Sequence, residues 1–383
     1  MSVVVQKFGG SSVADVPKLE RVAEKVAATR SSGVDVVVVI SAMGKTTDQL
    51  LALAHEVDPN PPRRELDMLL TTGERVSMAL LSMAIQKRGC DAISFTGSQS
   101  GIMTNDRHFD ARIIEVRPWR IEDELARGRV VIVAGYQGMS YRREITTLGR
   151  GGSDTTAIAL AAALGADRAE IYSDVDGVYS ADPRVVPDAK HLPELTYEQM
   201  QEMAEAGAKV LNSTAVEFAK RARIAIHARS TFQDGRQTIV HEGATGDAAA
   251  AVVGRKDLAR IRVSASDLED ALRTSGELGL SVRESALDGS EAHLVVSVST
   301  PDWAAARASL EARGWTVEPD LGAVTVVARE LGAHPTAMAA AMSALARVGI
   351  SLRGAQTAPL RWTGLVAAGD VDDAVRAVHA AME

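Results

Sequence analysis

Short apolar runs alternate with polar turns and amphipathic helical segments over the first 240 residues of the sequence. The run at 34–40 is almost entirely β-branched, which is typical of a strand buried on both faces of a parallel sheet. Helical signals follow such runs, for example over 155–164 and 208–221. The alternation predicts an α/β fold, a three-layer sandwich in which helices cover both faces of a mainly parallel sheet. In such folds ligands bind at the carboxyl ends of the strands, where the polar turns of this sequence lie.

Length and composition limit the functions open to the chain. At 383 residues it is too long for one compact core, so two or three domains are expected. The formal net charge of −8 gives no electrostatic reason to bind nucleic acid or an anionic membrane. Cys90 is the single cysteine, which excludes an intrachain disulfide and a thiol-rich metal site. Without a signal-peptide pattern or an apolar run approaching 18 residues, a cytoplasmic protein is expected.

The sequence changes character after about Val240. Residues 243–251 are rich in Gly and Ala and indicate a linker that follows an N-terminal domain at 1–242. Beyond the linker, shorter strand and helix signals fit a βαββαβ pattern used twice, which predicts two small α+β domains at 252–320 and 321–383. This C-terminal region lacks polar glycine turns, so we expect no chemistry in it.

The stretch Leu148–Thr156 reads Leu-Gly-Arg-Gly-Gly-Ser-Asp-Thr-Thr and stands directly before an alanine-rich helix. A glycine-rich turn at a helix N-terminus presents unpaired backbone N–H groups and the positive end of the helix dipole, which together favour anions. Arg150 adds a planar guanidinium group suited to a carboxylate or a phosphate. Glycines that only satisfy the geometry of a strand-to-helix turn are an equal alternative for this stretch by itself.

Two common nucleotide-binding motifs are excluded. Gly44-Lys45-Thr46 resembles the end of a P-loop, but Val39 stands where that motif has its first glycine. The turn at Gly149 has no complete G-x-G-x-x-G pattern, because Asp154 takes the last position. Neither a Walker NTPase nor a Rossmann dinucleotide site is therefore expected.

Further polar groups stand near the ends of predicted elements. Lys7 ends the first strand just before a Gly-Gly pair, where its ammonium group could contact phosphates that the glycine N–H groups also bind. Ser41 follows the second strand, Glu74 interrupts an apolar helix, and the segment 173–179 follows a later strand. Each has an ordinary alternative: a solvated lysine, a helix cap, a solvated helix face and an Asp-Gly turn, respectively.

These segments form an ordered series of motifs: Lys7–Ser12, Ser41–Asp48, Thr72–Glu74, Gly149–Thr156, Asp174–Tyr179, Ala181–Arg184 and Gly207–Leu211. In order and spacing the series closely resembles the aspartokinases of the amino acid kinase superfamily. The resemblance covers the first 240 residues almost without a gap. The second half of the C-terminal region, with His334-Pro335 and 371–379, resembles the paired ACT domains of that family.

The resemblance implies transfer of the γ-phosphoryl group of MgATP to the side-chain carboxylate of L-aspartate, giving 4-phospho-L-aspartate. That carboxylate, with a reference pKa of about 3.9, is ionised at pH 7 and needs no general base. The catalytic task is to bring two anions together and to neutralise charge on the transferring phosphoryl group. The implied cofactors are ATP and Mg²⁺, with no metal held directly by protein side chains.

The resemblance also assigns roles to individual positions. The catalytic positions are Lys7, Asp154 and Lys209. The ATP-binding positions are Lys7, Gly9, Gly10, Ser41, Ser173, Asp174, Tyr179, Arg184 and Lys209. The substrate-binding positions are Thr47, Glu74, Arg150, Gly151 and Ser153. Glu74 is expected to take the substrate ammonium group, Arg150 a substrate carboxylate, and Asp154 to orient the lysines.

The sequence departs from the family pattern in two places. Asn212-Ser213-Thr214 stands where the family usually has His-Pro-Arg, beside Lys209, and could shift nucleotide affinity. The first ACT-like repeat, at 252–320, is altered and lacks the family's effector loop, so inhibition by lysine or threonine is not implied, whereas a homodimer or higher oligomer is. Two other functions stay open: a kinase of another amino acid or carboxylate, and a non-catalytic ACT-type regulatory subunit.

Overall fold

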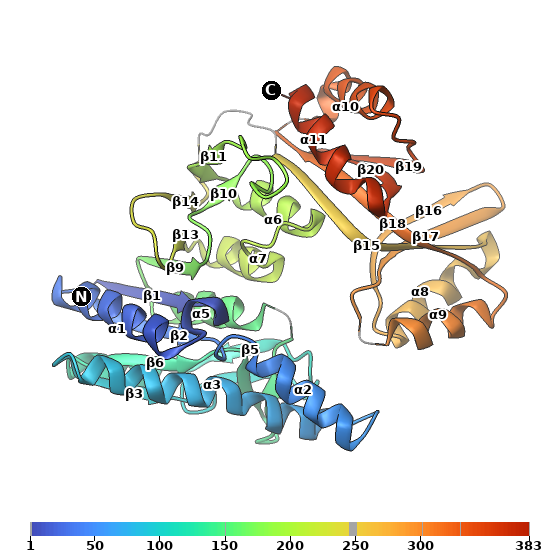
Figure 1. The fold of residues 1–383 in the computed structure, drawn as a ribbon. Helices are drawn as coiled ribbons and strands as arrows, with labels where there is room; N and C mark the ends of the chain where they lie inside the picture. The colour runs from blue at the N-terminus through green and yellow to red at the C-terminus, as the bar shows by residue number, and fades with distance from the viewer. Residues whose placement is uncertain (1, 150, 245–250, 301, 330, 383) are drawn as a thin grey trace. The chain divides into compact units, whose positions relative to one another are not determined.

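The computed structural model describes residues 2–149, 151–244, 251–300, 302–329 and 331–382. The chain forms two compact units (Figure 1). The N-terminal unit comprises Met1–Val178, His191–Ala204 and Lys209–Asp247, and the C-terminal unit comprises Tyr179–Lys190, Glu205–Ala208 and Ala248–Glu383.

The N-terminal unit is built on an eight-stranded sheet in the order β12-β14-β13-β9-β1-β2-β6-β3. The strands are parallel to their neighbours except for the antiparallel pair β13 and β14. Their bounds are β1 (Val3–Phe8), β2 (Asp35–Ile40), β3 (Ala92–Phe95), β6 (Val130–Ala134), β9 (Arg168–Ser173), β12 (Glu194–Leu195), β13 (Ile226–Ser230) and β14 (Gln237–Val240). The predicted mainly parallel sheet is confirmed.

Helices cover both faces of this sheet. Every residue of β2 is buried. Its residues Val36, Val38 and Ile40 share one core with α1 and α3, whereas Val39 faces the side on which α5 packs. The helices of the unit are η1 (Gly10–Val13), α1 (Val16–Ser31), α2 (Thr46–Val57), α3 (Arg63–Gln86), α4 (Trp119–Ala126), α5 (Gly152–Ala163), α6 (Tyr197–Ala206, whose last two residues belong to the C-terminal unit) and α7 (Ser213–Ala222). The three-layer α/β fold follows from this double burial.

A second, four-stranded sheet in the order β5-β4-β7-β8 was not predicted. Its strands are β4 (Ile102–Thr104), β5 (Ile113–Val116), β7 (Gln137–Ser140) and β8 (Ile145–Thr147). Strands of three or four residues are too short for an alternation of side chains to be recognised in the sequence. Strand β8 ends directly before the glycine-rich turn, so this small sheet positions one side of the candidate site.

The helix predicted at 208–221 is wrong at its start. Helix α7 begins only at Ser213, because the Asn212 side chain accepts hydrogen bonds from the backbone N–H groups of Thr214 (2.9 Å) and Ala215 (3.3 Å). Such a cap satisfies the donors of the first helical turn and ends helix propagation in the N-terminal direction. Lys209 therefore lies in a loop before the helix.

The C-terminal unit holds a six-stranded antiparallel sheet in the order β16-β17-β15-β18-β20-β19. The elements β15 (Ala251–Ser264), α8 (Leu268–Glu277), β16 (Ser281–Asp288), β17 (Glu291–Ser297), α9 (Trp303–Glu311) and β18 (Thr316–Val327) follow a βαββαβ order. The elements α10 (Pro335–Arg347), β19 (Gly354–Ala358), β20 (Arg361–Ala367) and α11 (Val371–Met382) continue from β18. The short elements β10 (Val178–Tyr179), β11 (His191–Leu192), η2 (Ala265–Asp267), η3 (Leu331–Ala333) and η4 (Ala368–Asp370) complete the described chain.

The two predicted C-terminal domains share one continuous sheet. Strand β18 crosses the boundary expected at 320, and most of the expected linker, 245–250, lies outside the described residues. Separate buried clusters nevertheless form around α8 and α9 and around α10 and α11. The α+β character of this region is confirmed, and its division into two domains stays a prediction.

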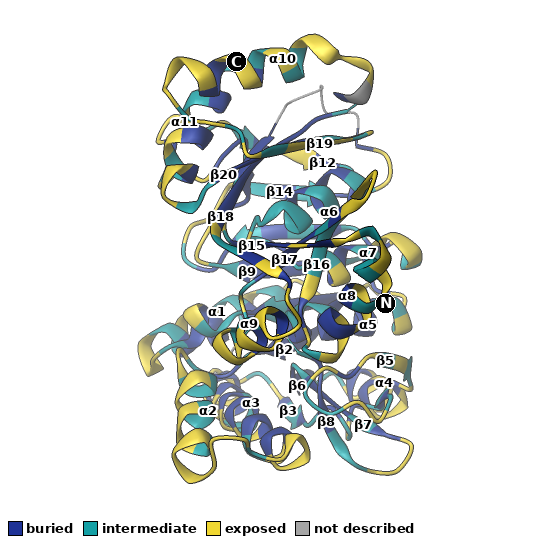
Figure 2. Cartoon of the chain, turned by 90° about the vertical axis from the view of Figure 1, so that its right-hand side faces the viewer, coloured by how far each residue is buried: buried dark blue, intermediate teal, exposed yellow. Residues whose placement is uncertain are grey.

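Helix α3 has the length and apolar composition of a membrane-crossing helix, the only one in the described ranges that does. Half of its most apolar window is buried. Leu81 and Ile85 pack in the core beneath the large sheet, and Figure 2 shows the mixture of buried and exposed positions along the helix. The packing is that of a core helix.

Gly73 in the middle of α3 provides a test of this packing. An added Cβ would lie 2.9 Å from Cβ of Ala42, in the loop after β2. We expect Gly73→Ala to lower the free energy of unfolding by about 1–2 kcal/mol, although alanine ordinarily favours a helix interior. Gly276→Ala in α8 is the matched control, because a Cβ there meets nothing within 4 Å. It should stabilise by about 0.5–1 kcal/mol. Equilibrium urea unfolding measures both, and stabilisation by Gly73→Ala would contradict the packing.

Candidate active site

The loops that follow β1 and β2 are joined through their backbones. Gly44 N–H donates to the Gly10 carbonyl at 3.1 Å, and Ser41 N–H donates to the carbonyl of the last residue of β1 at 3.1 Å. A Cβ on Gly10 would lie 2.8 Å from the carbonyl oxygen of Ala42. Only glycine allows this approach. The predicted Gly9, Gly10 and Ser41 therefore lie together at the carboxyl ends of adjacent parallel strands.

Lys7 and Asp154 form an ion pair at this edge of the sheet. Lys7 Nζ lies 2.7 Å from Asp154 Oδ1, and the two side chains are only 12% and 13% exposed. Lys7 Nζ is also 3.5 Å from the position of a Cβ on Gly9. A buried ammonium group needs a partner, and Asp154 supplies it. The pair places the Lys7 ammonium group beside the Gly9–Gly10 backbone, and the roles expected for the two residues stay predictions.

The glycine-rich turn leads into α5 through two left-handed residues. Gly149 and Gly151 have φ of 71° and 76°, and Gly151 is the N-cap of the helix. Asp154 stands in the first turn, where the positive end of the helix dipole favours a carboxylate. The buried Ser153 hydroxyl lies 2.7 Å from the position of a Cβ on Gly135. Arg150, the predicted carboxylate-binding residue, lies outside the described residues.

Glu74 is buried without full compensation. It is 3% exposed, and its Oε1 accepts a hydrogen bond from Ala42 N–H at 3.2 Å. Its Oε2 has no hydrogen-bond partner in the structure. Burial raises the pKa of Glu74 to about 7. A carboxylate in this state is stabilised by an arriving cation, so the site is suited to an ammonium group.

The segment before α7 meets the glycine-rich turn. A Cβ on Gly151 would lie 2.2 Å from Nδ2 and 2.4 Å from Cγ of Asn212. Asn212 therefore packs directly against the α-carbon of Gly151. The exposed Lys209 stands three residues earlier. Asn212, where the sequence departs from the family pattern, therefore both contacts the glycine-rich turn and caps α7.

The remaining predicted positions are less closely connected. Ser173 ends β9, and its carbonyl accepts a hydrogen bond from Thr231 N–H at 2.9 Å. Asp174 directly follows this strand. Thr47 lies half-buried in the first turn of α2. Tyr179 and Arg184 belong to the C-terminal unit. There the Arg184 guanidinium group binds Asp182 at 2.6 and 3.0 Å.

Two residues near the turn were missed. Tyr136 has φ of 66°, its N–H donates to Thr156 Oγ1 at 3.3 Å, and its carbonyl accepts from Leu148 N–H at 2.9 Å. Burial raises the pKa of its phenol, with the charge of Glu74 contributing. Asp67 is fully buried on α3. For Tyr136, the available signal was the segment Gly-Tyr-Gln-Gly at 135–138, directly after a strand. For Asp67, it was the seven-residue spacing to Glu74, which puts both carboxylates on one helix face.

No group of three His, Cys, Asp or Glu side chains among the described residues could hold a metal ion. The charged groups instead divide into an anion-binding part, Lys7 with the glycine backbone and the start of α5, and a cation-binding part at Glu74. The two parts are linked through Ala42, whose N–H binds Glu74 and whose carbonyl touches Gly10. This arrangement of charges suits a phosphate on one side and an ammonium group on the other.

Comparisons with known proteins identify the family of this chain. The profile of the amino acid kinase family matches residues 2–230. The aspartokinase of Mycolicibacterium smegmatis is 42% identical, over 100% of this chain and 96% of that protein, and that of Corynebacterium glutamicum is 42% identical, over 99% and 96%. The structure of E. coli aspartokinase III in complex with aspartate and ADP is similar with a TM-score of 0.86 and 25% identity, over 99% of both chains. The chain therefore belongs to the amino acid kinase family and, within it, to the aspartokinases.

Proposed function

We propose that this chain transfers the γ-phosphoryl group of MgATP to the side-chain carboxylate of L-aspartate, giving 4-phospho-L-aspartate. The observation that carries the proposal is a buried Lys7–Asp154 ion pair connected, through the Gly10 and Ala42 backbones, to a buried Glu74 with an unpartnered oxygen. Relatives that span the whole chain are aspartokinases, and E. coli aspartokinase III binds aspartate and ADP. Donor and acceptor sites of this chain are assigned on that basis.

The part of the site that binds the phosphoryl donor, ATP, would act mainly through charge. Lys7 and the Gly9 and Gly10 backbone would face the transferring phosphoryl group, with Lys209 as a second cation. Ser41, Ser173 and Asp174 would contact the rest of the nucleotide, and Tyr179 and Arg184 stay nucleotide-binding positions implied by the family resemblance. Asp154 would orient Lys7 through their ion pair rather than act as a base. Pre-placed charge of this kind lowers the barrier because it needs no reorganisation during the reaction.

The acceptor side selects an α-amino acid. The α-ammonium group would satisfy Glu74 Oε2, Arg150 would take a carboxylate, and Thr47, Gly151 and Ser153 would complete the pocket. The reacting carboxylate is ionised at neutral pH, so the site needs to hold it in line with the phosphoryl group and nothing more.

Magnesium would arrive as part of the nucleotide substrate. The described residues offer no carboxylate cluster for it. Bound to the phosphates, Mg²⁺ supplies neutralisation of the charge that develops during transfer. Asp154, which pairs with Lys7, would be the side chain that interacts with this magnesium ion through water.

A panel of acceptors tests the proposed function. The purified chain with MgATP and hydroxylamine should convert L-aspartate to its hydroxamate, whereas L-glutamate and succinate should give little. Succinate tests recognition of the α-ammonium group, because it differs from aspartate only in lacking that group. A preference for another amino acid would identify a paralogous kinase, and the absence of any hydroxamate would refute the proposal.

Lys7→Ala and Asp154→Asn should each lower kcat about 10²–10³-fold or more, because each removes pre-placed charge or its orientation at the phosphoryl group. Hydroxamate formation at saturating aspartate and ATP measures the loss, and circular dichroism checks the fold. Lys87→Ala is the matched control, since that ammonium group pairs with Glu20 on the surface with 75% of the side chain exposed. Near-normal turnover in either variant would contradict the catalytic role proposed for the substituted residue.

The KM for aspartate should depend on pH through Glu74. With a pKa of about 7 in the free enzyme, Glu74 is mostly protonated at pH 6 and mostly ionised at pH 8. KM for aspartate should therefore rise about tenfold from pH 8 to pH 6, while the substrate's side-chain carboxylate, with a pKa of about 3.9, stays ionised. Steady-state kinetics at saturating ATP measures this, and a flat profile would contradict the assignment.

The Glu74→Gln variant tests the proposed role of the Glu74 carboxylate independently. The pKa of Glu74 is about 7 in the folded state and about 4.5 in the unfolded state, so ionisation of Glu74 destabilises the fold. This destabilisation grows from about pH 4.5 to pH 7 and persists at higher pH. Without substrate at pH 8, the variant should therefore melt a few degrees higher than wild type, while its KM for aspartate rises at least about tenfold. A lower Tm together with normal KM would count against the assignment.

Two wider expectations accompany the function. The six-stranded sheet of the C-terminal unit ends in β16 and β19. Their outer edges could pair with a second copy, which supports the expected homodimer or higher oligomer. A cytoplasmic location is expected from the sequence and from the soluble nature of the reactants.

A further inference from the structure

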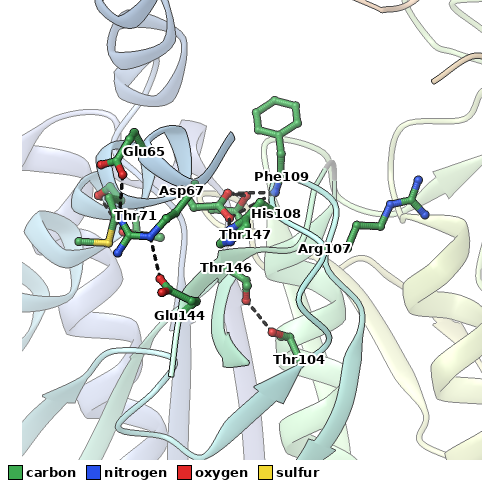
Figure 3. Close-up of polar contacts among 12 residues, drawn as sticks. Glu65, Asp67, Thr71, Thr104, Arg107, His108, Phe109, Glu144, Thr146 and Thr147 are labelled. Carbon is green, nitrogen blue, oxygen red and sulfur yellow. Dashed lines mark hydrogen bonds and ion pairs between the residues drawn. The ribbon is translucent and has the colours of Figure 1, made fainter. Parts of the chain in front are cut away.

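Asp67 is a carboxylate buried completely between three parts of the N-terminal unit. It lies on α3, is 0% exposed, and accepts hydrogen bonds from Thr147 Oγ1 at 2.6 Å, from His108 Nδ1 at 2.6 Å and from Phe109 N–H at 3.1 Å. Figure 3 shows these groups converging on its two oxygens. A carboxylate is retained in such a place only when donors surround it.

The donors come from two segments that border the glycine-rich turn. Thr147 is the last residue of β8 and directly precedes Leu148, where the turn begins. His108 and Phe109 belong to a loop held to the same strand, since Ala111 N–H donates to the Thr147 carbonyl at 2.8 Å. Thr146 also bonds Thr104 of β4 at 2.6 Å.

The loop itself touches the turn. A Cβ on Gly149 would lie 3.0 Å from Asp110 Oδ1 and 3.5 Å from the Phe109 carbonyl oxygen. Phe109 has φ of 71°, a left-handed conformation that is unfavourable for an aromatic residue, and its N–H is one of the groups bound to Asp67. The carboxylate therefore stabilises the backbone conformation that brings the loop against Gly149.

The same helix carries the acceptor-side carboxylate. Glu74 is seven residues after Asp67, two turns further along the same face of α3, about 10 Å along the helix axis. Between them, the Thr71 carbonyl accepts from Gln137 Nε2 at 3.2 Å, which fixes the strand after Tyr136 to the helix. Helix α3 thus holds Glu74 directly and the turn through Asp67.

We propose that Asp67 is a positioning residue for the acceptor. By binding Thr147, His108 and Phe109, it fixes the start of the glycine-rich turn relative to Glu74, so that the two sides of the site hold the two ends of one α-amino acid. The inference rests on the proposed function, because it concerns the same acceptor site. Asp67 does not touch substrate or nucleotide in this assignment. Its loss should weaken acceptor binding and spare the nucleotide.

The test compares KM for aspartate with KM for ATP in conservative variants. Asp67→Asn keeps the shape but replaces one acceptor oxygen with a donor, so it should raise KM for aspartate about tenfold or more and change KM for ATP less than about twofold. Thr147→Val should act in the same direction, whereas Thr147→Ser keeps the hydroxyl and should restore a near wild-type KM. Glu65→Gln, on the same helix with 62% of its side chain exposed, is the matched control and should change neither constant.

The outcomes separate the two proposals. A wild-type enzyme that forms no aspartyl hydroxamate refutes the proposed function and, with it, the positioning role. An active wild type whose Asp67→Asn and Thr147→Val variants keep KM for aspartate refutes the positioning role alone. Equal rises in both KM values would show general destabilisation and also refute it. If Asp67→Asn does not fold, the Thr147→Val and Thr147→Ser pair gives the decision by itself.

Discussion

The constraint on which this site depends is the burial of the Glu74 carboxylate with one oxygen left without a partner. Water would satisfy that oxygen at the surface, but Glu74 is 3% exposed, and burial raises its pKa to about 7. The folded enzyme therefore keeps a group whose ionised form is stabilised only when a cation arrives. In the proposed assignment an α-ammonium group would provide that cation, and acceptor recognition would be coupled to the relief of an unfavourable electrostatic state.

Helix α3 transmits this constraint to the rest of the unit. It packs against α1 and the large sheet through Leu81 and Ile85, and at Gly73 it approaches the loop after β2 closely enough to exclude a side chain. The backbone of that loop binds Glu74 and touches Gly10, which follows the strand that carries Lys7. In the proposed assignment this helix would therefore relate Glu74 to the loops that face the phosphate, as transfer between two anions requires.

The sequence was sufficient for the α/β fold, the parallel sheet and the identity of the loops at its carboxyl edge, because long β-branched runs and glycine-rich turns have strong local signals. It predicted Lys7 and Asp154, which the structure joins at 2.7 Å. It left Glu74 open between a solvated face and a ligand, since burial depends on contacts distant in the chain.

Asp67 and His108, 41 residues apart, could not be paired for the same reason. The three- and four-residue strands β4, β5, β7 and β8 were below the length at which alternation is visible. The start of α7 was placed too early because the cap at Asn212 had not been recognised.

Proton release on aspartate binding tests the central claim most directly. Calorimetric titration at pH 6, repeated in buffers of different ionisation enthalpy, counts the protons displaced. Because Glu74 is mostly protonated at pH 6 in the free enzyme, binding of the α-ammonium group should release close to one proton at pH 6 and almost none at pH 8. Aspartate that binds at pH 6 without releasing a proton would contradict the account.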